Sequence, residues 1–382
     1  MSWRKVTVSD QREEFVHLAR KAGVPMAELC RRFGVSRKTG YKWLGRFGEG
    51  GREALKDVSR RPHHSPDRTA EAMEQAILAL RGEYPHWGAR KLRRLLQDRG
   101  VEDAPAASTV NGILKRQGLL EASQVAHPGP HHRFEHPAPN DLWQIDFKGP
   151  LGLPGGDVHL LSVLDDHSRF LVLLQVCPDE CGETVRQALI PAFRTYGLPH
   201  RILVDNGSPW GYTTDHPFTA VSVWFLRLGI GVTHGRPYHP QTQGKVEKFN
   251  GTLVAEFLQG VDFADGPAMA IGSTRYRELY NTVRPHHALD LDTPVSRYRP
   301  SPRSYPEQLP PIEFGPGDVV RQVHEDGCIA FRGRRFKVGK GFRGYPVAVR
   351  PTTGDGRFAA YFLTHRIAEI DCTSAVKTGV LQ

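Results

Sequence analysis

Cysteine is scarce in this sequence, and long hydrophobic runs are missing. No Cys-x-x-Cys spacing occurs, which argues against a cysteine-based zinc site and is typical of a reducing cytoplasm. No run approaches the roughly 18 apolar residues of a membrane-spanning helix, and the first residues lack the apolar centre of a signal peptide. A glycine-rich nucleotide-binding loop is also absent, which disfavours a nucleotide-dependent metabolic enzyme. We therefore expect a cytoplasmic protein with no membrane partner.

Charge is unevenly distributed along the 382 residues, whose formal net charge is +10. Residues 1–140 carry a net charge of +9, residues 141–300 carry −3, and residues 301–382 carry +4. Ordinary solvated faces would explain this pattern. Basic nucleic-acid-binding modules on either side of a catalytic domain whose acids hold metal would explain it equally well. The length itself predicts several domains rather than one.

The first module, residues 1–58, has the layout of a helix-turn-helix domain. Asp10 and Glu13 are spaced as a capping box that opens a first helix. A short helix over 26–33, a glycine turn and a helix over 37–47 capped by Ser36 complete the pattern. A three-helix core with a basic surface is the alternative. If the third helix reads a major groove, its outer face supplies the contacts, namely Arg37, Lys38, Tyr41, Lys42 and Arg46.

A second helical module is expected over residues 67–120, after a basic linker over 59–66. Its apolar periodicity predicts a helix over 70–81, a second one starting at Trp87, and a third capped by Ser108. This module resembles another helix-turn-helix, and a solvated basic face is an equally good interpretation. The expected phosphate contacts are Arg90, Lys91, Arg93 and Arg94.

Residues 121–140 are rich in proline and histidine and form the next linker. Residues 141–298 alternate strands and helices in a pattern that predicts a mixed sheet with helices on both faces. The expected strands are 142–148, 158–164, 169–176, 201–205 and 230–234, and the expected helices are 182–196, 218–228, 243–258 and 267–282. A proline-rich linker over 299–317 follows. The short strands of residues 318–382 predict a small β-barrel.

Three carboxylates in this central domain are candidates for a metal site. Asp146 interrupts an apolar strand, where a carboxylate needs a partner or a metal ion. Asp205 ends an apolar strand, although Asp-Asn-Gly alone also reads as a turn. Glu247 borders the apolar stripe of a helix, and a solvent-exposed glutamate is its simplest interpretation. Together, three carboxylates at one point would hold Mg²⁺, or Mn²⁺ as a substitute, for phosphoryl transfer.

The order and spacing of the surrounding motifs resemble a DDE-type insertion-sequence transposase with a retroviral-integrase-like catalytic core. The resemblance covers about residues 10–370 and rests on Trp143-x-x-Asp146, Val204-Asp205-Asn-Gly207, His239-Pro-Gln-x-Gln-Gly-x-Val-Glu247-x-x-Asn250-Gly, and Tyr280-Asn-x-x-Arg284-Pro-His-His-x-Leu289 followed by Thr293-Pro294. It implies a ribonuclease H-like, five-stranded mixed sheet flanked by helices and an enzyme that transfers DNA strands.

The resemblance also implies roles for individual residues and partners. Asp146, Asp205 and Glu247 would be both catalytic residues and ligands of two Mg²⁺ ions. Gln243, Lys245 and Lys248 match positions near the DNA. The partners would be double-stranded DNA, as element ends and as target, and further copies of the chain in at least a dimer. The protein would act in the bacterial cytoplasm and associate with the nucleoid when bound to DNA.

The sequence departs from the pattern of this family in two ways. The interval between Asp205 and Glu247 holds 41 residues, more than such cores usually have, and the zinc-binding module of viral integrases is absent. Asp165 and Asp166 are extra acids that we interpret as structural, with Asp166 better suited to an auxiliary role.

Two alternative functions are less consistent with these features. A DNA-binding regulator without catalysis would not need the three acids. A nuclease that cuts without joining would not need two sequence-reading modules.

Overall fold

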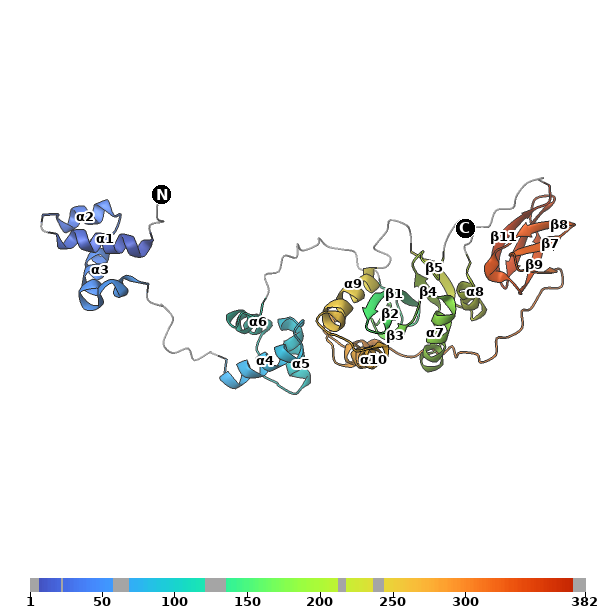
Figure 1. Ribbon diagram of the computed structural model, residues 1–382, viewed down its shortest axis with the longest axis horizontal. Helices are drawn as coiled ribbons and strands as arrows, with labels where there is room; N and C mark the ends of the chain where they lie inside the picture. Colours follow the sequence, from blue (N-terminus) through green and yellow to red (C-terminus); the bar gives the residue numbers. More distant parts are fainter. Residues whose placement is uncertain are drawn as a thin grey trace. The chain divides into compact units, whose positions relative to one another are not determined.

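The computed structural model describes residues 7–21, 23–57, 69–120, 135–211, 218–235 and 244–373 (Figure 1). The chain divides into two compact units, Met1–Thr69 and Ala70–Gln382. Within the described ranges, no helix combines the length and the apolar character needed to cross a membrane.

The first unit is a small helical domain. It contains α1 (Val8–Arg20), α2 (Met26–Arg32), α3 (Arg37–Gly50) and the 3₁₀ turn η1 (Gly51–Leu55). The predicted cap of α3 is confirmed, because the Ser36 hydroxyl accepts a hydrogen bond from the Thr39 amide at 3.1 Å. The three helices enclose a core of Phe15, Val16, Leu29, Cys30 and Leu55.

The first helix begins earlier than the sequence predicted. The capping box joins Thr7 and Asp10: the Thr7 hydroxyl accepts from the Asp10 amide at 3.2 Å, and the Asp10 carboxylate accepts from the Thr7 amide at 2.9 Å. The prediction that Asp10 is the cap was therefore wrong. Glu13, its expected partner, forms an ion pair with Arg52 at 2.9 Å instead.

The second unit opens with a three-helix module, α4 (Glu71–Glu83), α5 (Ala89–Asp98) and α6 (Ala107–Arg116). Its core includes Ile77, Trp87, Leu92 and Ile113. Ser108 lies inside α6, whose N-cap is Ala106, so the predicted cap was wrong. Sequence periodicity located these helices, but the cap position was not visible in it.

A five-stranded sheet forms the centre of the second unit, and all five predicted strands are present. The strands are β1 (Leu142–Leu153), β2 (Gly156–Asp165), β3 (Leu171–Cys177), β4 (Arg201–Val204) and β5 (Gly231–His234). Their order is β3-β2-β1-β4-β5. The β1–β2 and β2–β3 pairs are antiparallel, whereas β1–β4 and β4–β5 are parallel. This mixed sheet places β1 at the middle.

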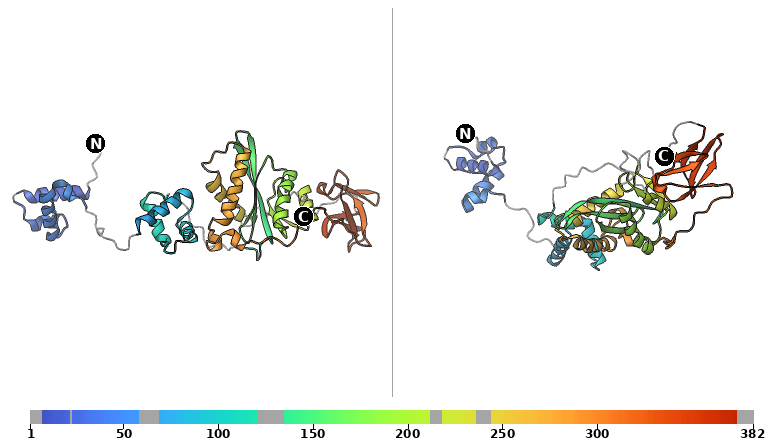
Figure 2. Two further views of the ribbon diagram at one scale, coloured as in Figure 1. Left: turned by 90° about the horizontal axis from the view of Figure 1, so that it is seen from below. Right: turned by 45° about the vertical axis from the view of Figure 1, so that its right-hand side comes forward.

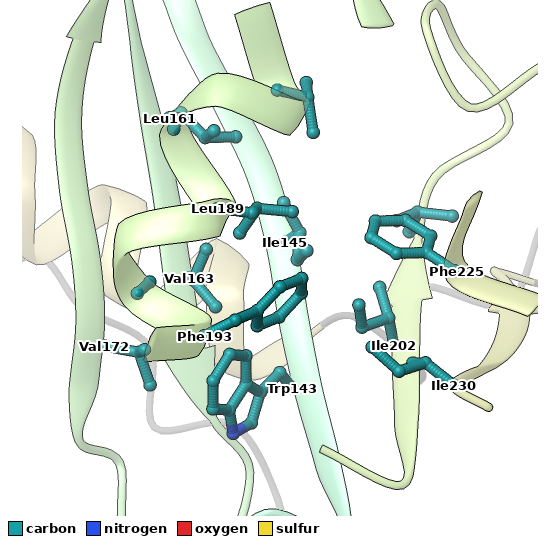
Figure 3. Close-up of a cluster of buried hydrophobic side chains, with 14 of the residues drawn as sticks. Trp143, Ile145, Leu161, Val163, Val172, Leu189, Phe193, Ile202, Phe225 and Ile230 are labelled. Carbon is teal, nitrogen blue, oxygen red and sulfur yellow. The ribbon is translucent and has the colours of Figure 1, made fainter. Parts of the chain in front are cut away.

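Helices cover both faces of the sheet, as predicted (Figure 2). The rings of Trp143 on β1 and Phe193 on α7 stack in the layer shown in Figure 3. That face is covered by α7 (Gly182–Tyr196) and α8 (Ala220–Arg227). The opposite face is covered by α9 (Gly244–Leu253), the π-helical turn η3 (Val254–Leu258) and α10 (Gly266–Thr282). Because side chains alternate along a strand, Gln144 and Asp146 belong to this second face.

The segment after α10 remains attached to the core. It includes η4 (His287–Leu289) and α11 (Pro294–Arg297). The proline-rich stretch 299–317 has no helix or strand, as its composition predicted. The Arg303 guanidinium nevertheless donates to the carbonyls of Pro199 and Gly229 at 2.6 and 2.8 Å. These bonds satisfy backbone groups at the ends of neighbouring elements and hold the stretch against the sheet domain.

The C-terminal domain is an open sheet with a hairpin rather than a closed barrel. Strands β6 (Val319–Gln322), β9 (Pro346–Pro351), β10 (Arg357–Phe362) and β11 (His365–Asp371) form a sheet in the order β11-β10-β9-β6. A separate pair, β7 (Cys328–Phe331) and β8 (Arg334–Lys337), and the 3₁₀ turn η5 (Lys340–Phe342) complete it. The barrel prediction is corrected here, because among the described strands β7 and β8 pair only with each other and leave β6 and β11 as edges. Val223 and Leu226 of α8 share this domain's hydrophobic core.

Candidate active site at the central strands

Asp146 occupies the middle strand of the sheet and faces α9. Its carboxylate accepts a hydrogen bond from the Asn250 side-chain amide at 2.5 Å. Burial raises the pKa of Asp146 to about 6, an effect opposed by the Asn250 bond and reinforced by the negative charge of Asp205. A half-buried carboxylate next to a second carboxylate is the arrangement in which a cation stabilises both charges.

Asp205 is brought to Asp146 by strand pairing. The parallel register sets Trp143 opposite Ile202 and Gln144 opposite Leu203. Extending this register by two residues sets Asp146 beside Asp205, on strands that lie about 4.8 Å apart. The Asp205 carboxylate also accepts from the Gly207 amide at 3.0 Å. The turn and the acid-site interpretations of Asp-Asn-Gly are therefore compatible.

Glu247 is carried by α9, which runs along β1. The Val246 amide donates to the Gln144 side-chain oxygen at 3.2 Å, four residues before the contact between Asn250 and Asp146. The four residues from Val246 to Asn250 rise about 6 Å along the helix, and the two residues from Gln144 to Asp146 rise about 6.7 Å along the strand. Because these lengths are similar, both contacts form at once and fix the position of α9 along β1. Glu247 lies between them and its side chain is exposed.

The three acids have the donor chemistry of a divalent-metal site. Within the described ranges, no group of three His, Cys, Asp or Glu side chains is close enough to hold a metal ion. Two features still fit a hard cation. The candidate ligands are all carboxylate oxygens, the donors that Mg²⁺ prefers. The side-chain oxygen of Asn250, beside Asp146, is buried without a hydrogen-bond partner in the described structure.

The extra acids at the end of β2, Asp165 and Asp166, have different surroundings. Asp165 is fully buried and accepts hydrogen bonds from the Asn140 amide at 2.7 Å and the Ser168 hydroxyl at 2.6 Å. It holds the turn between β2 and β3. Asp166 is bonded to Gln144 and Lys245 instead, at 2.8 and 2.5 Å, and so contacts both β1 and α9.

The predicted DNA-contacting residues of the core are placed as follows. The Lys245 ammonium faces Asp166, and its side chain is only 19% exposed. Lys248 is exposed on the outer side of α9. Gln243 lies outside the described residues. Of the two that the structure describes, Lys248 is the one with an exposed side chain that can face a DNA backbone.

The predicted contacts of the N-terminal unit lie on α3. Arg37, Lys38, Tyr41 and Lys42 are exposed, and the Arg46 guanidinium lies 5.1 Å from the centre of the Trp43 ring. A basic, solvent-facing helix surface is what major-groove reading requires. DNA contact by these residues stays a prediction.

Lys91 in the second module is not positioned for DNA. It is buried, and its ammonium lies 3.4 Å from the Glu256 carboxylate, which also binds the Arg284 guanidinium at 2.7 Å. Burial, followed by the charge of Arg284, lowers the pKa of Lys91 to about 8. Local sequence patterns do not indicate these partners, because Glu256 lies 165 residues from Lys91 along the chain. A phosphate contact by Lys91 would first require this pair to break.

Arg90 and Arg94 flank Lys91 on α5. Arg90 is exposed. Arg94 is bonded to Asp98 at 2.8 Å and to Asp292 at 3.1 Å. Arg93 is partly buried. Of the four residues predicted to contact phosphates from this module, Arg90 alone has an exposed side chain with no acidic partner among the described residues.

The exposure of Arg90 and the burial of Lys91 predict different results for substitutions at these neighbouring positions. Arg90→Ala should make the negative slope of log K against log salt concentration shallower by about 0.9, because one phosphate contact is lost. Lys91→Met should leave that slope unchanged and leave the thermal midpoint equal or higher, because Arg284 still neutralises Glu256. DNA-binding titrations at several salt concentrations measure both slopes. A shallower slope for Lys91→Met would place its ammonium on DNA.

Models of known families match five segments of the chain. They describe a helix-turn-helix domain (residues 11–63), a homeodomain-like domain (39–114), an integrase core domain (136–240, and a second model over 228–294) and the C-terminal domain of IS481 family transposases (318–378). The chain thus has the domain set of an insertion-sequence transposase with a retroviral-integrase-like catalytic core, as the motifs predicted. Within that class, its C-terminal domain is of the IS481 family type.

Individual relatives agree with this class. The chain is 28% identical over 239 residues to an uncharacterized protein of insertion element IS407 from Burkholderia multivorans, covering 60% of this chain and 81% of that protein. It is 23% identical over 250 residues to a putative transposase for insertion sequence element IS5376 from Geobacillus stearothermophilus, covering 61% and 59% of the two chains. A simian foamy virus type 3 Pro-Pol polyprotein is 31% identical over 136 residues, which are 35% of this chain and 11% of that protein.

Solved structures of retroviral integrases also match. The simian T-cell lymphotropic virus intasome, in complex with PP2A regulatory subunit B56 gamma, contains a chain that is 17% identical at a TM-score of 0.36, covering 75% of this chain and 96% of that one. The HTLV-2 integrase catalytic core domain in complex with magnesium is 16% identical at a TM-score of 0.33, covering 43% and 99%.

Proposed function

We propose that this protein binds the terminal inverted repeats of its element and catalyses metal-dependent DNA cleavage and strand transfer. The observation that carries the proposal is the placement of Asp146 and Asp205 on adjacent parallel strands, with Glu247 on the helix that runs beside β1. The integrase core match supports the same reaction class, a polynucleotidyl transferase. The protein would act in the bacterial cytoplasm, on nucleoid DNA.

Asp146, Asp205 and Glu247 would hold two Mg²⁺ ions, or Mn²⁺ as a substitute. When bound, such ions lower the pKa of an attacking oxygen and stabilise the leaving oxygen of a phosphodiester. Asp146 and Asp205, on adjacent strands, would both supply ligands to these ions, and Glu247 would complete the ligand set. Asn250 orients the Asp146 carboxylate through its 2.5 Å hydrogen bond.

The DNA strands would be exchanged in two steps. Water first attacks the phosphate at the element end and releases a 3′-hydroxyl. That hydroxyl then attacks a phosphodiester of the target DNA, so one ester bond forms as another breaks and no covalent enzyme intermediate is needed. Positioning and charge neutralisation supply most of the catalysis.

The basic modules would position the DNA for these steps. The exposed face of α3 would read the repeats. Lys248, on the same helix as Glu247, would contact the backbone near the scissile phosphate. Two element ends must meet in one complex, so we expect at least a dimer of the chain on DNA.

A strand-transfer assay distinguishes the proposal from its two rivals. The full chain is incubated with Mg²⁺, a short duplex carrying the element end, and supercoiled plasmid. Joined products, with the end covalently attached to plasmid, are expected. Cut DNA without joining would indicate a nuclease, and end binding with neither product would indicate a regulator that has lost catalysis.

A further inference from the structure

A second polar cluster lies next to the three acids. Asp166 is 2% exposed, and its carboxylate accepts from the Gln144 side-chain amide at 2.8 Å, the Lys245 ammonium at 2.5 Å and the His136 backbone amide at 2.9 Å. Gln144 is also 2% exposed, and its side-chain oxygen accepts from the Val246 backbone amide at 3.2 Å. Each of these buried polar groups is therefore satisfied.

The cluster joins the two segments that carry catalytic acids. Gln144 lies two residues before Asp146 on β1, so the two side chains share one face of the sheet. Lys245 and Val246 immediately precede Glu247 in the first turn of α9. Asp166, from the turn after β2, contacts both segments. One carboxylate thus ties the strand of the first acid to the helix of the third.

The direction of each hydrogen bond makes the connection specific. The first amides of a helix have no partner within it, and here Gln144 supplies an acceptor for the Val246 amide. A glutamine amide presents oxygen at one side and NH₂ at the other. Because Asp166 accepts from the NH₂, the oxygen must face Val246. Asp166 therefore fixes the orientation in which Gln144 can hold α9.

Chain connectivity alone does not provide this alignment. β5, a strand of the sheet, ends at His234 and α9 begins at Gly244. A connection of this length can span up to about 30 Å, so it does not by itself fix the position of α9 along β1. The apolar side of α9 packs on the sheet through Val246, Phe249 and Leu253. Apolar packing is non-directional, so the polar contacts must set how far α9 is displaced along β1.

We propose that Asp166 is a positioning residue which, acting through Gln144 and Lys245, fixes the first turn of α9 so that Glu247 is held at the strand bearing Asp146. This inference rests on the proposed function for its consequence, since the aligned residue is the third acid. Asp166 touches no reacting atom. Its role is to keep Glu247 in place when divalent ions and DNA are absent as well as when they are bound.

The test uses the full chain with Asp166→Asn and, separately, Lys245→Met, which removes the ammonium while keeping an unbranched side chain. In metal-free protein, the amides of Val246 and Glu247 should exchange with solvent about tenfold faster in both variants, as expected when about 1.4 kcal/mol of local protection is lost. In strand transfer, the Mg²⁺ concentration for half-maximal rate should rise about tenfold. Thr252→Ala, later on the same helix, is the matched control and should change neither quantity.

Two outcomes would overturn the proposal. One is unchanged amide exchange in both variants, and the other is unchanged Mg²⁺ dependence despite faster exchange. If Asp166→Asn fails to fold, Lys245→Met decides the matter by the same two measurements. If wild-type protein transfers no strands, the proposed function fails, whereas the exchange experiment still shows whether Asp166 fixes α9.

Discussion

Asp146→Asn and Glu247→Gln should each reduce strand transfer by at least about a thousandfold while leaving binding to the element end unchanged. Each substitution keeps the shape of the side chain but removes the negative charge that a divalent ion requires. Removing a single hydrogen-bond donor that stabilises transition-state charge in other enzymes already costs about 10²- to 10³-fold. The fold should persist, because an asparagine at position 146 still accepts the hydrogen bond from Asn250.

The matched control for these variants is Asp290→Asn. The Asp290 side chain is 95% exposed and lies on the segment after α10, outside the candidate site. This variant loses the same charge without touching the acids, so its strand-transfer rate should equal that of the wild type. Joined products formed by the Asp146→Asn protein at the wild-type rate would show that Asp146 does not hold a catalytic ion.

Phe193→Ala should lower the free energy of unfolding of the second unit by about 3–5 kcal/mol, the range measured for large aromatic truncations in protein cores. The Phe193 side chain is fully buried on α7 and stacks against Trp143 at 5.8 Å between ring centres. Its ring also packs against that of Trp224 on α8, at 5.6 Å between ring centres. Truncation leaves a cavity between β1 and both helices. Denaturant unfolding followed by tryptophan fluorescence measures the loss.

The control for that substitution is Ile271→Ala on α10. Ile271 is 57% exposed, and surface truncations usually change stability by less than about 0.5 kcal/mol. A loss of less than 1 kcal/mol for Phe193→Ala would contradict the close packing of α7 on β1. Trp143, which contacts Phe193, lies on the same strand as Asp146. The packing of α7 on β1 therefore also helps to position Asp146.

Local patterns predicted most of the sheet domain. The alternation of strand and helix segments predicted a mixed sheet with helices on both faces, and the apolar stripe of α9 predicted its buried face. Both features depend on neighbours within a few residues of the chain. The position of Asp205 also followed from an apolar strand that ends in Asp-Asn-Gly, although its alignment with Asp146 needed the pairing of β1 with β4.

Long-range contacts could not be predicted in this way. Lys91 and Lys245 look like free cations in the sequence, yet their carboxylate partners, Glu256 and Asp166, lie 165 and 79 residues away. Charge patterns report a residue's type but not its tertiary partner. The open C-terminal sheet was mistaken for a barrel for the same reason, since strand content does not specify which edges pair.

Locating divalent ions in the DNA-bound protein tests the central claim most directly. The full chain would be crystallised with an element-end duplex and Mn²⁺, and the ions located by their anomalous scattering. We expect ions coordinated by the carboxylates of Asp146, Asp205 and Glu247 at the scissile phosphate. Ions at that phosphate held by other residues, with these three carboxylates outside coordination distance, would contradict it.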